Sequence, residues 1–127
     1  MRIIRQKIED GPYSVEAILT RMEEGACVCL GGGHSHVGVI VLALPRESLL
    51  KDGSVSSSTS VINMLGHKDD VVALPLAERL CREFNMPVTV TAGIHIDLAD
   101  DTDIRRICHN VDELTRLLCE ALRQEQG

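Results

Sequence analysis

Aromatic residues are almost absent from this sequence of 127 residues, which contains no Trp, one Tyr and one Phe. Proteins that bind single-stranded nucleic acids usually stack the bases on aromatic side chains. Acidic residues also outnumber basic ones, 19 to 13, and the formal net charge of -6 at pH 7 repels a phosphate backbone. We therefore expect no nucleic-acid partner, and we expect any planar ligand to lie against aliphatic side chains or backbone.

Long apolar runs and paired cysteine motifs are missing as well. No run approaches the roughly 20 residues that a membrane span needs, and the charged N-terminal segment lacks the apolar part of a signal peptide. The five cysteines contain no CxxC pair, which argues against a disulfide framework or a zinc ribbon. We therefore expect a cytoplasmic protein with no membrane partner, whose cysteines are mainly small buried apolar residues.

The first half of the sequence predicts strands within one domain that spans residues 1–127. Hydrophobic residues make up 44% of the chain and charged residues 25%, which is usual for a globular domain. Residues 3–8 are short and mixed, a turn signal follows at 10–12, and residues 13–20 alternate between apolar and polar, which together predict a hairpin. Two apolar runs, 26–30 and 37–44, predict strands that are buried on both faces and flank a glycine turn as an antiparallel pair.

The middle of the sequence predicts a loop, a short strand and a helix. The serine-rich tract within residues 46–60 is typical of a surface loop, and a short strand is expected near 61–65. Apolar residues at i, i+4 spacing then predict a helix with Asp69 or Asp70 as its N-cap, and Asn85 and Pro87 are expected to end it. Pro75 falls inside this pattern, so we expect the first turn of the helix to be irregular.

The closing part of the chain predicts one more strand and one more helix. A strand over residues 88–92 brings His95 to its end. After an acidic loop at 97–103, Asn110 and Glu113 have the spacing of a capping box and predict the start of the last helix. The order of elements predicts an α+β fold, a mostly antiparallel sheet with two helices of the C-terminal half packed on it. The small size and the apolar strands also favour a homodimer.

Histidine supplies the main candidates for chemistry. His36, His67 and His95 lie in glycine-flanked turns or at the ends of predicted elements, where side chains can converge on a pocket. Three imidazoles with an open fourth position suit zinc, which would activate a water molecule. A zinc-dependent hydrolase that uses these three histidines is therefore one alternative. The sequence has no GxSxG elbow and no Walker motif, so a serine nucleophile and the common nucleotide sites lack support.

Glycines and a lysine could bind an anion. Gly31, Gly32 and Gly33 permit close approach of the backbone, so their N–H groups could cradle a phosphate. Lys68 precedes the predicted helix N-terminus, where backbone N–H groups and the helix dipole favour anions. A tight turn between strands and a solvated lysine are the structural alternatives for these residues.

Three segments taken together resemble a known family. They are Gly31-Gly32-x-x-x-His36-x-Gly38, then Gly66-His67-Lys68-Asp69, then Thr91-Ala92-Gly93-Ile94-His95. Their order and separation resemble the prenylated-flavin chaperone family, the LpdD-like small D-type accessory proteins of gallate and hydroxyarylic acid decarboxylases. The resemblance runs from about residue 13 to residue 124.

The resemblance implies a carrier with no catalytic activity of its own. Such a carrier binds prenylated FMN made by a flavin prenyltransferase, with FMN itself as a related ligand, and passes it to a UbiD-type decarboxylase. Glycine amides and Lys68 would hold the phosphate, imidazoles would bind the phosphate or ring heteroatoms, and aliphatic strand faces would cover the ring. A homo-oligomeric assembly module is a further alternative. The positions that match the family pattern, and that we therefore expect to bind the flavin, are Gly31, Gly32, His36, Gly38, His67, Lys68, Asp69, Thr91, Gly93 and His95.

Overall fold

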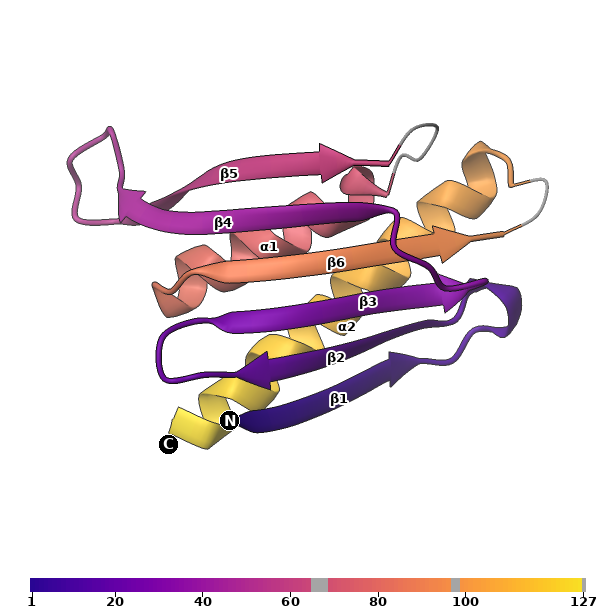
Figure 1. Cartoon of the computed structure of the whole chain (residues 1–127), viewed down its shortest axis with the longest axis horizontal. Coiled ribbons are helices and arrows are strands. Elements are labelled where there is room, and N and C mark those ends of the chain that lie inside the picture. Colours follow the sequence, from indigo (N-terminus) through magenta and orange to yellow (C-terminus); the bar gives the residue numbers. More distant parts are fainter. Residues whose placement is uncertain (65–68, 97–98, 127) are drawn as a thin grey trace.

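The computed structural model describes residues 1–64, 69–96 and 99–126. Within these residues lie six β-strands, two α-helices and one short 3-10 helix (Figure 1). Their order along the chain is β1 (Arg2–Ile8), η1 (Gly11–Tyr13), β2 (Val15–Arg21), β3 (Ala26–Gly33), β4 (Val39–Glu47), β5 (Val55–Asn63), α1 (Asp70–Phe84), β6 (Val88–His95) and α2 (Asp101–Gln126).

The strands form one sheet in the order β1-β2-β3-β6-β4-β5. β3 and β6 run parallel, and every other neighbouring pair is antiparallel. The predicted hairpin of β1 and β2 is present, and both helices come from the second half of the chain. The predicted α+β class, with two helices on a mostly antiparallel sheet, is therefore confirmed.

β6 lies in the middle of the sheet, between β3 and β4. The prediction that the two apolar runs form an adjacent antiparallel pair is therefore wrong. β6 pairs with both of them, with Val88 opposite Ala26 on the parallel side and Ala92 opposite Val39 on the antiparallel side. Residues 34–38, which connect β3 to β4, cross over the end of β6 instead of closing a hairpin (Figure 1). β6 lies far from β3 and β4 in the sequence, so no local sequence pattern could indicate that it pairs with them.

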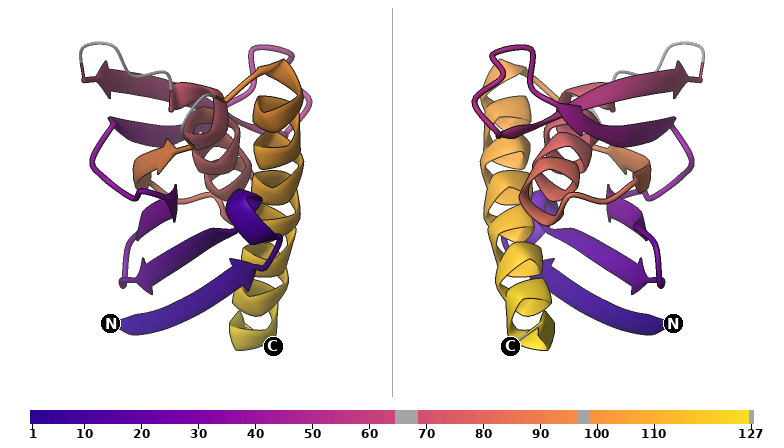
Figure 2. Two further views of the ribbon diagram at one scale, coloured as in Figure 1. Left: turned by 90° about the vertical axis from the view of Figure 1, so that its right-hand side faces the viewer. Right: turned by 90° about the vertical axis from the view of Figure 1, so that its left-hand side faces the viewer.

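Both helices cover the same face of the sheet (Figure 2). α1 packs on β4, β5 and β6, whereas α2 packs on β1 and β2. Residues of the inner strands alternate between buried and exposed, because successive side chains point to opposite faces. The fully buried side chains between helices and sheet include Leu19, Leu30, Leu76, Leu80, Leu114, Leu118 and Leu122.

We call the opposite side of the sheet the outer face, and both helices leave it uncovered (Figure 2). The expectation that the central strands are buried on both faces is wrong for this reason. Cys27 and Cys29 of β3 are exposed, Cys108 is half-buried, and Cys81 and Cys119 are buried in the helices. The expectation that the cysteines are mainly buried is therefore wrong for Cys27 and Cys29.

The serine-rich tract is an edge strand, not a loop. β5 runs from Val55 to Asn63 and pairs with β4 along its whole length. All nine of its residues are exposed or half-buried, so small polar side chains are compatible with the strand. Serine has a weak preference for strands. The sequence pattern therefore indicated a loop for the serine-rich tract and a strand only near residues 61–65.

α1 begins and ends near the predicted positions. Asp69 takes the N-cap position, but its side chain makes no capping hydrogen bond. The helix is continuous through Pro75, so the irregular first turn that we expected there is absent. It ends at Asn85, which has the left-handed values φ 49° and ψ 55° and donates its backbone N–H to the carbonyl of Cys81.

α2 begins at Asp101, well before the predicted start at Asn110. The capping box exists, but its members are Asp100 and Asp103. The Asp103 N–H donates to Oδ1 of Asp100 at 2.9 Å, and the Asp100 N–H donates to Oδ2 of Asp103 at 3.0 Å. Asn110 is instead a buried residue inside the helix whose Nδ2 donates to Asp10 and to the Tyr13 carbonyl. No described helix combines the length and apolar character needed to cross a membrane.

Candidate functional site

The candidate site forms where the chain leaves β3 and crosses the outer face. Because β3 and β6 are parallel, their carboxyl ends lie side by side at one end of the sheet. We call residues 34–38 the crossing segment. Its first residue, His34, donates its N–H to the carbonyl of His95 at 3.0 Å, and its last, Gly38, donates to the carbonyl of Ala92 at 2.9 Å. The crossing segment is thus hydrogen-bonded to β6 at both of its ends.

Three predicted site glycines lie where this crossing leaves no space for a side chain. A Cβ at Gly93 would collide with the carbonyl oxygen of His36, and one at Gly38 would collide with the carboxylate of Asp69. A Cβ at Gly31 would lie only 2.9 Å from the Cβ of Ser35. The absence of side chains therefore lets the crossing segment lie directly on β3 and β6.

Two neighbouring glycines have similar constraints. A Cβ at Gly32 would lie 2.8 Å from the carbonyl oxygen of Ser14, at the start of β2. Gly33 has a φ of 58°, in the region that favours glycine, and a Cβ there would collide with the carbonyl oxygen of His95. The glycine run thus shapes the end of β3 and the start of the crossing segment.

His36 is held on the crossing segment by two contacts. Its Nδ1 lies 2.9 Å from the carbonyl oxygen of His34 and therefore carries a hydrogen, because a carbonyl can only accept. Its Nε2 lies 3.5 Å from Oδ2 of Asp69. The side chain of His36 remains 21% exposed, so its ring can still contact a ligand.

Asp69 connects the helix to the end of β6. Its other carboxylate oxygen, Oδ1, accepts the backbone N–H of Ile94 at 3.0 Å, and its side chain is only 10% exposed. The sequence singled out Asp69 as a possible helix cap and as part of a family motif. The side chain reaches β6 and His36 instead of its own helix, a long-range contact that no local pattern could indicate.

His95 and Thr91 complete the described part of the site. His95, at the end of β6, is exposed, and its ring centroid lies 6.5 Å from that of His36 in an edge-to-face arrangement. Thr91 lies on the same strand, opposite Cys29 of β3 and Ile40 of β4. We call His36, Asp69, Thr91, Gly93 and His95 the β6-end cluster.

The remaining predicted site residues are His67 and Lys68, which lie outside the described residues. His109, on α2, is exposed and belongs to a helix on the far side of the sheet from the crossing segment. Among residues 1–64, 69–96 and 99–126, no three His, Cys, Asp or Glu side chains are grouped so that they could hold a metal ion. The zinc alternative rests on His36 and His95 together with His67.

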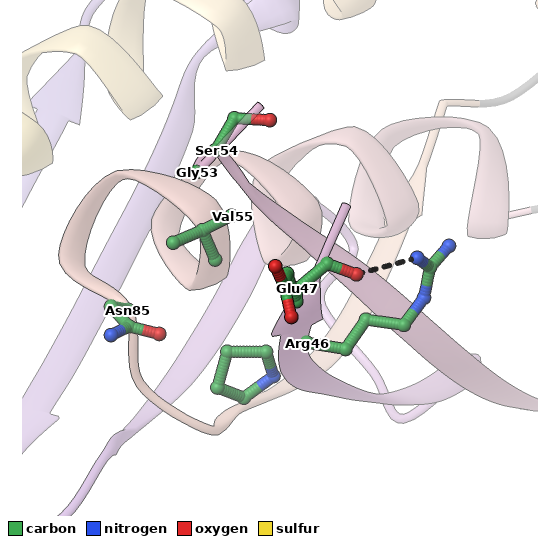
Figure 3. Close-up of a pocket in the computed structure, with 7 residues that line it drawn as sticks. Arg46, Glu47, Gly53, Ser54, Val55 and Asn85 are labelled. Atoms are coloured by element: carbon green, nitrogen blue, oxygen red, sulfur yellow. Dashed lines mark hydrogen bonds between the residues drawn. The ribbon is translucent and has the colours of Figure 1, made fainter. Parts of the chain in front are cut away.

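Figure 3 shows a hollow of about 430 Å³ at the carboxyl end of β4. The β6-end cluster lies near the other end of β4, where Val39 pairs with Ala92. In the hollow, Arg46 donates from Nη1 to the carbonyl of Glu47 at 3.2 Å. None of the predicted site residues within the described ranges lines this hollow. The lining residues are Pro45, Arg46, Glu47, Gly53, Ser54, Val55 and Asn85.

The fold places this chain in an architecture shared with an assembly chaperone. It matches a chain of the "Crystal Structure of a Novel Chaperone Complex for Yeast 20S Proteasome Assembly" with a TM-score of 0.60. The match covers 99% of this chain and 98% of the yeast chain. With 20% sequence identity, the likeness concerns the fold alone.

The family follows from the sequence match. The model of the prenylated flavin chaperone LpdD-like domain matches residues 9–123, a range that includes the whole β6-end cluster. The chain therefore belongs to the family of prenylated flavin chaperone LpdD-like domains, and the resemblance seen in the sequence is confirmed. A comparison with curated proteins gave no match.

Proposed function

We propose that this chain, acting as one domain, carries prenylated FMN from the flavin prenyltransferase that makes it to a UbiD-type decarboxylase, without catalysing a reaction itself. One observation carries the proposal beyond the family match. Parts of all three segments that resemble the family meet at the end of β6, where residue 69 reaches both the crossing segment and residue 94. Segments far apart in the sequence thus build one place on the outer face.

The chemistry of this place suits a flavin, which joins a broad apolar ring system to polar edges and a phosphate. The imidazoles of His36 and His95 can bind a phosphate or ring heteroatoms, and Thr91 adds a hydroxyl. Ile40, opposite Thr91, is 43% exposed and provides an aliphatic surface beside them. With so few aromatic residues in the chain, aliphatic contact has to replace ring stacking.

A carrier must also release its ligand. The described donors are two imidazoles and a hydroxyl on an open face, and such groups bind reversibly without forming a covalent bond. Binding that is much tighter than that of the receiving enzyme would oppose transfer, since a ligand moves toward the partner with the higher affinity. An open site of moderate affinity therefore suits delivery.

Anaerobic native mass spectrometry tests the proposal directly. The full chain is co-expressed with and without a flavin prenyltransferase, and the mass of the bound ligand is read. We expect prenylated FMN on the chain only when the prenyltransferase is present. A chain that never carries a flavin would contradict the proposed function, and a zinc mass in both samples would favour the hydrolase alternative.

Histidine variants test the site. His36→Ala and His95→Ala are expected to lower the fraction of chain that retains the flavin, whereas His109→Ala, on the far side of the sheet, leaves it unchanged. Flavin retention equal to that of the unaltered chain in both site variants would rule out the β6-end cluster. Delivery is then measured by mixing loaded chain with apo-decarboxylase and following the flavin mass from one protein to the other.

A further inference from the structure

The two edges of the sheet differ in how they are protected (Figure 1). β1 forms one edge, and three of its seven residues are the basic Arg2, Arg5 and Lys7. β5 forms the other edge, and its nine residues, Val55–Asn63, include no charged residue and no proline. Charged side chains and prolines are the usual means by which an edge strand avoids pairing with another chain. The edge of β5 is therefore open to an additional strand, whereas the edge of β1 is protected.

Hydrogen bonds at both ends of the β4–β5 pair show which main-chain groups of β5 point away from the sheet. Just beyond one end, Met64 donates its N–H to the carbonyl of Gly38 at 2.9 Å. Just beyond the other end, Ser48 donates its N–H to the carbonyl of Ser54 at 3.0 Å. Even-numbered residues of the two strands therefore face each other as hydrogen-bonded pairs, because such pairs alternate along an antiparallel ladder. The odd-numbered residues of β5, which direct their N–H and C=O groups outward, are Val55, Ser57, Thr59, Val61 and Asn63.

Pro45 agrees with this alternation. It lies opposite Ser57, in a pair that makes no hydrogen bonds across the ladder, and proline has no N–H to contribute there. No other residue that the structure describes bonds to the outward main-chain groups of β5. Five N–H and five C=O groups thus lie at alternate positions along an edge of about 30 Å, which is the pattern that an added strand pairs with.

The edge of β5 leads to the β6-end cluster. Met64 follows directly after β5, and its hydrogen bond to Gly38 joins the end of the edge to the crossing segment. A Cβ at Gly38 would collide with the carboxylate of Asp69, a member of the cluster. A strand added to β5 therefore ends beside the cluster. A protein that receives the flavin has to come within reach of this place, and docking along the edge brings it there.

We propose that the edge of β5 is the docking site of the receiving decarboxylase, which adds an extended segment of its own chain to the sheet. This docking site rests on the proposed function, because the partner is the protein to which the flavin passes. Main-chain hydrogen bonds supply the affinity in this mode of recognition, and side chains at alternate positions supply the specificity.

The side chains beside the edge define the chemistry of that segment. Ile62, opposite Ile40 on the outer face, is 70% exposed at the end of β5 nearest the cluster. Val61, opposite the buried Val41, points to the helix side and is 38% exposed. α1 packs against β5 there, and Val71 in its first turn is 55% exposed. The segment that fits is an uncharged strand with aliphatic side chains at the end next to the cluster.

Binding of the apo-decarboxylase to variants of residue 59 tests the docking site. Thr59→Pro removes an outward N–H in the middle of the edge and leaves the hydrogen bonds to β4 in place, because residue 59 makes none of them. We expect it to weaken binding to the intact, flavin-free chain about tenfold, which corresponds to one main-chain hydrogen bond. Thr59→Val keeps the N–H and the branched shape, so this matched control should bind like the unaltered chain. Biolayer interferometry measures both.

Amide hydrogen exchange on the unaltered chain gives a second measurement that needs no variant. The outward N–H groups of Ser57, Thr59 and Val61 should exchange rapidly in the free chain. Those of Ser58 and Ser60 bond to β4 and should exchange slowly with or without a partner. Addition of the apo-decarboxylase is expected to slow exchange in the first group, so that the alternation along β5 disappears.

Several results would overturn the docking site. Equal binding by Thr59→Pro and Thr59→Val, or rapid exchange of the outward N–H groups with the apo-decarboxylase bound, would place this partner on another surface. Protection that depends on the concentration of the chain alone would assign the edge to a second copy. Protection by the flavin prenyltransferase and not by the decarboxylase would assign it to the enzyme that loads the chain. Ser57→Pro replaces Thr59→Pro should that variant fail to fold by circular dichroism.

Failure of the docking site and failure of the proposed function can be told apart. Thr59→Pro co-expressed with the flavin prenyltransferase is expected to retain the flavin like the unaltered chain in native mass spectrometry, since the β6-end cluster is unchanged. A chain that never carries a flavin contradicts the proposed function, whatever binds the edge. Loaded Thr59→Pro and Thr59→Val that deliver the flavin to the decarboxylase equally fast would contradict the docking site alone.

Discussion

The carbonyl oxygen of His36 occupies the space in which a side chain at Gly93 would begin. Backbone therefore lies on backbone where the crossing segment passes over β6. This contact, together with the hydrogen bond from Gly38 to Ala92, fixes how far His36 reaches across the outer face. The position of the imidazole thus depends on a residue that has no side chain.

Gly93→Ala is expected to lower the free energy of unfolding by about 1–3 kcal/mol, the usual cost of overpacking a close contact. The obstacle is a main-chain oxygen, so no neighbouring side chain can be shortened to relieve it. Urea unfolding measures the change. Thr89→Ala, which shortens a side chain on the same face of β6, is the control, and an equal loss in both variants would show that the crossing segment does not press on Gly93.

Gly31→Ala should behave differently, because the obstacle there is the Cβ of Ser35 at 2.9 Å. Alone it is expected to cost about 1–2 kcal/mol of unfolding free energy through overpacking. In a Ser35→Gly background most of that cost should disappear, since the opposing Cβ is gone. A double-mutant cycle by urea unfolding measures the coupling, and additive losses would contradict the contact.

Asp69→Ala and Asp69→Asn separate the two contacts of this carboxylate. Alanine leaves the backbone N–H of Ile94 without its acceptor, which is expected to cost about 1–3 kcal/mol of unfolding free energy. Asparagine can keep that acceptor but loses the negative charge beside His36, so we expect near-normal stability with reduced flavin retention.

Urea unfolding and native mass spectrometry read the two effects of the Asp69 variants. Asp70→Asn removes the neighbouring carboxylate at the same end of α1 and serves as the control. If Asp69→Asn lost as much stability as Asp69→Ala, the hydrogen bond to Ile94 would not be what holds the helix start to β6.

Acid should weaken the attachment of the first hairpin to α2. Hydrogen bonds from Arg106 and then Asn110 lower the pKa of the Asp10 carboxyl below its ordinary value of 3.8. The unfolded chain therefore binds a proton at this carboxyl more readily than the folded chain does. Its contribution to stability is present above pH 3.8 and is lost as the pH falls through the lowered pKa.

Urea unfolding at decreasing pH checks this dependence. Asp10→Asn removes the titrating group, so the decline of its unfolding free energy below pH 3.8 should be shallower than that of the unaltered chain. Asp52→Asn is the comparison variant. The pKa of the Asp52 carboxyl is also lowered, but by Ser54 within its own loop, so this variant removes a titrating group without changing the contact with Arg106. Identical curves for Asp10→Asn and the unaltered chain would contradict a role for the contact with Arg106.

Local patterns in the sequence were sufficient for part of the fold. Alternation and turn residues predicted the first hairpin and β6, and apolar spacing predicted α1 with its end at Asn85. The start of α2 was missed because Asn110 and Glu113 have the same spacing as Asp100 and Asp103, and only the structure shows which pair exchanges hydrogen bonds. Spacing alone does not distinguish a cap from the interior of a helix.

What could not be predicted depends on contacts between distant segments. The family resemblance indicated which residues belong together, and the structure shows that the β6-end cluster is one place. The reach of Asp69 to Ile94 and the closeness of His36 to Gly93 follow from the insertion of β6 between β3 and β4. The exposed outer face was missed because apolar strands look alike whether one face or both faces are covered. Flavin binding by these residues stays a prediction.

The position of β6 also affects how the chain can be synthesised and folded. β6 is the last of the described strands to leave the ribosome, yet it is the strand that joins β3 to β4. Until residue 95 has emerged, the growing chain can form β1, β2 and β3 as one set and β4 with β5 as another, and nothing connects the two sets within a sheet. Such late, long-range pairing slows folding. A nascent chain that stalls before Val88 would therefore leave unpaired the edges of β3 and β4 that β6 covers in the complete sheet.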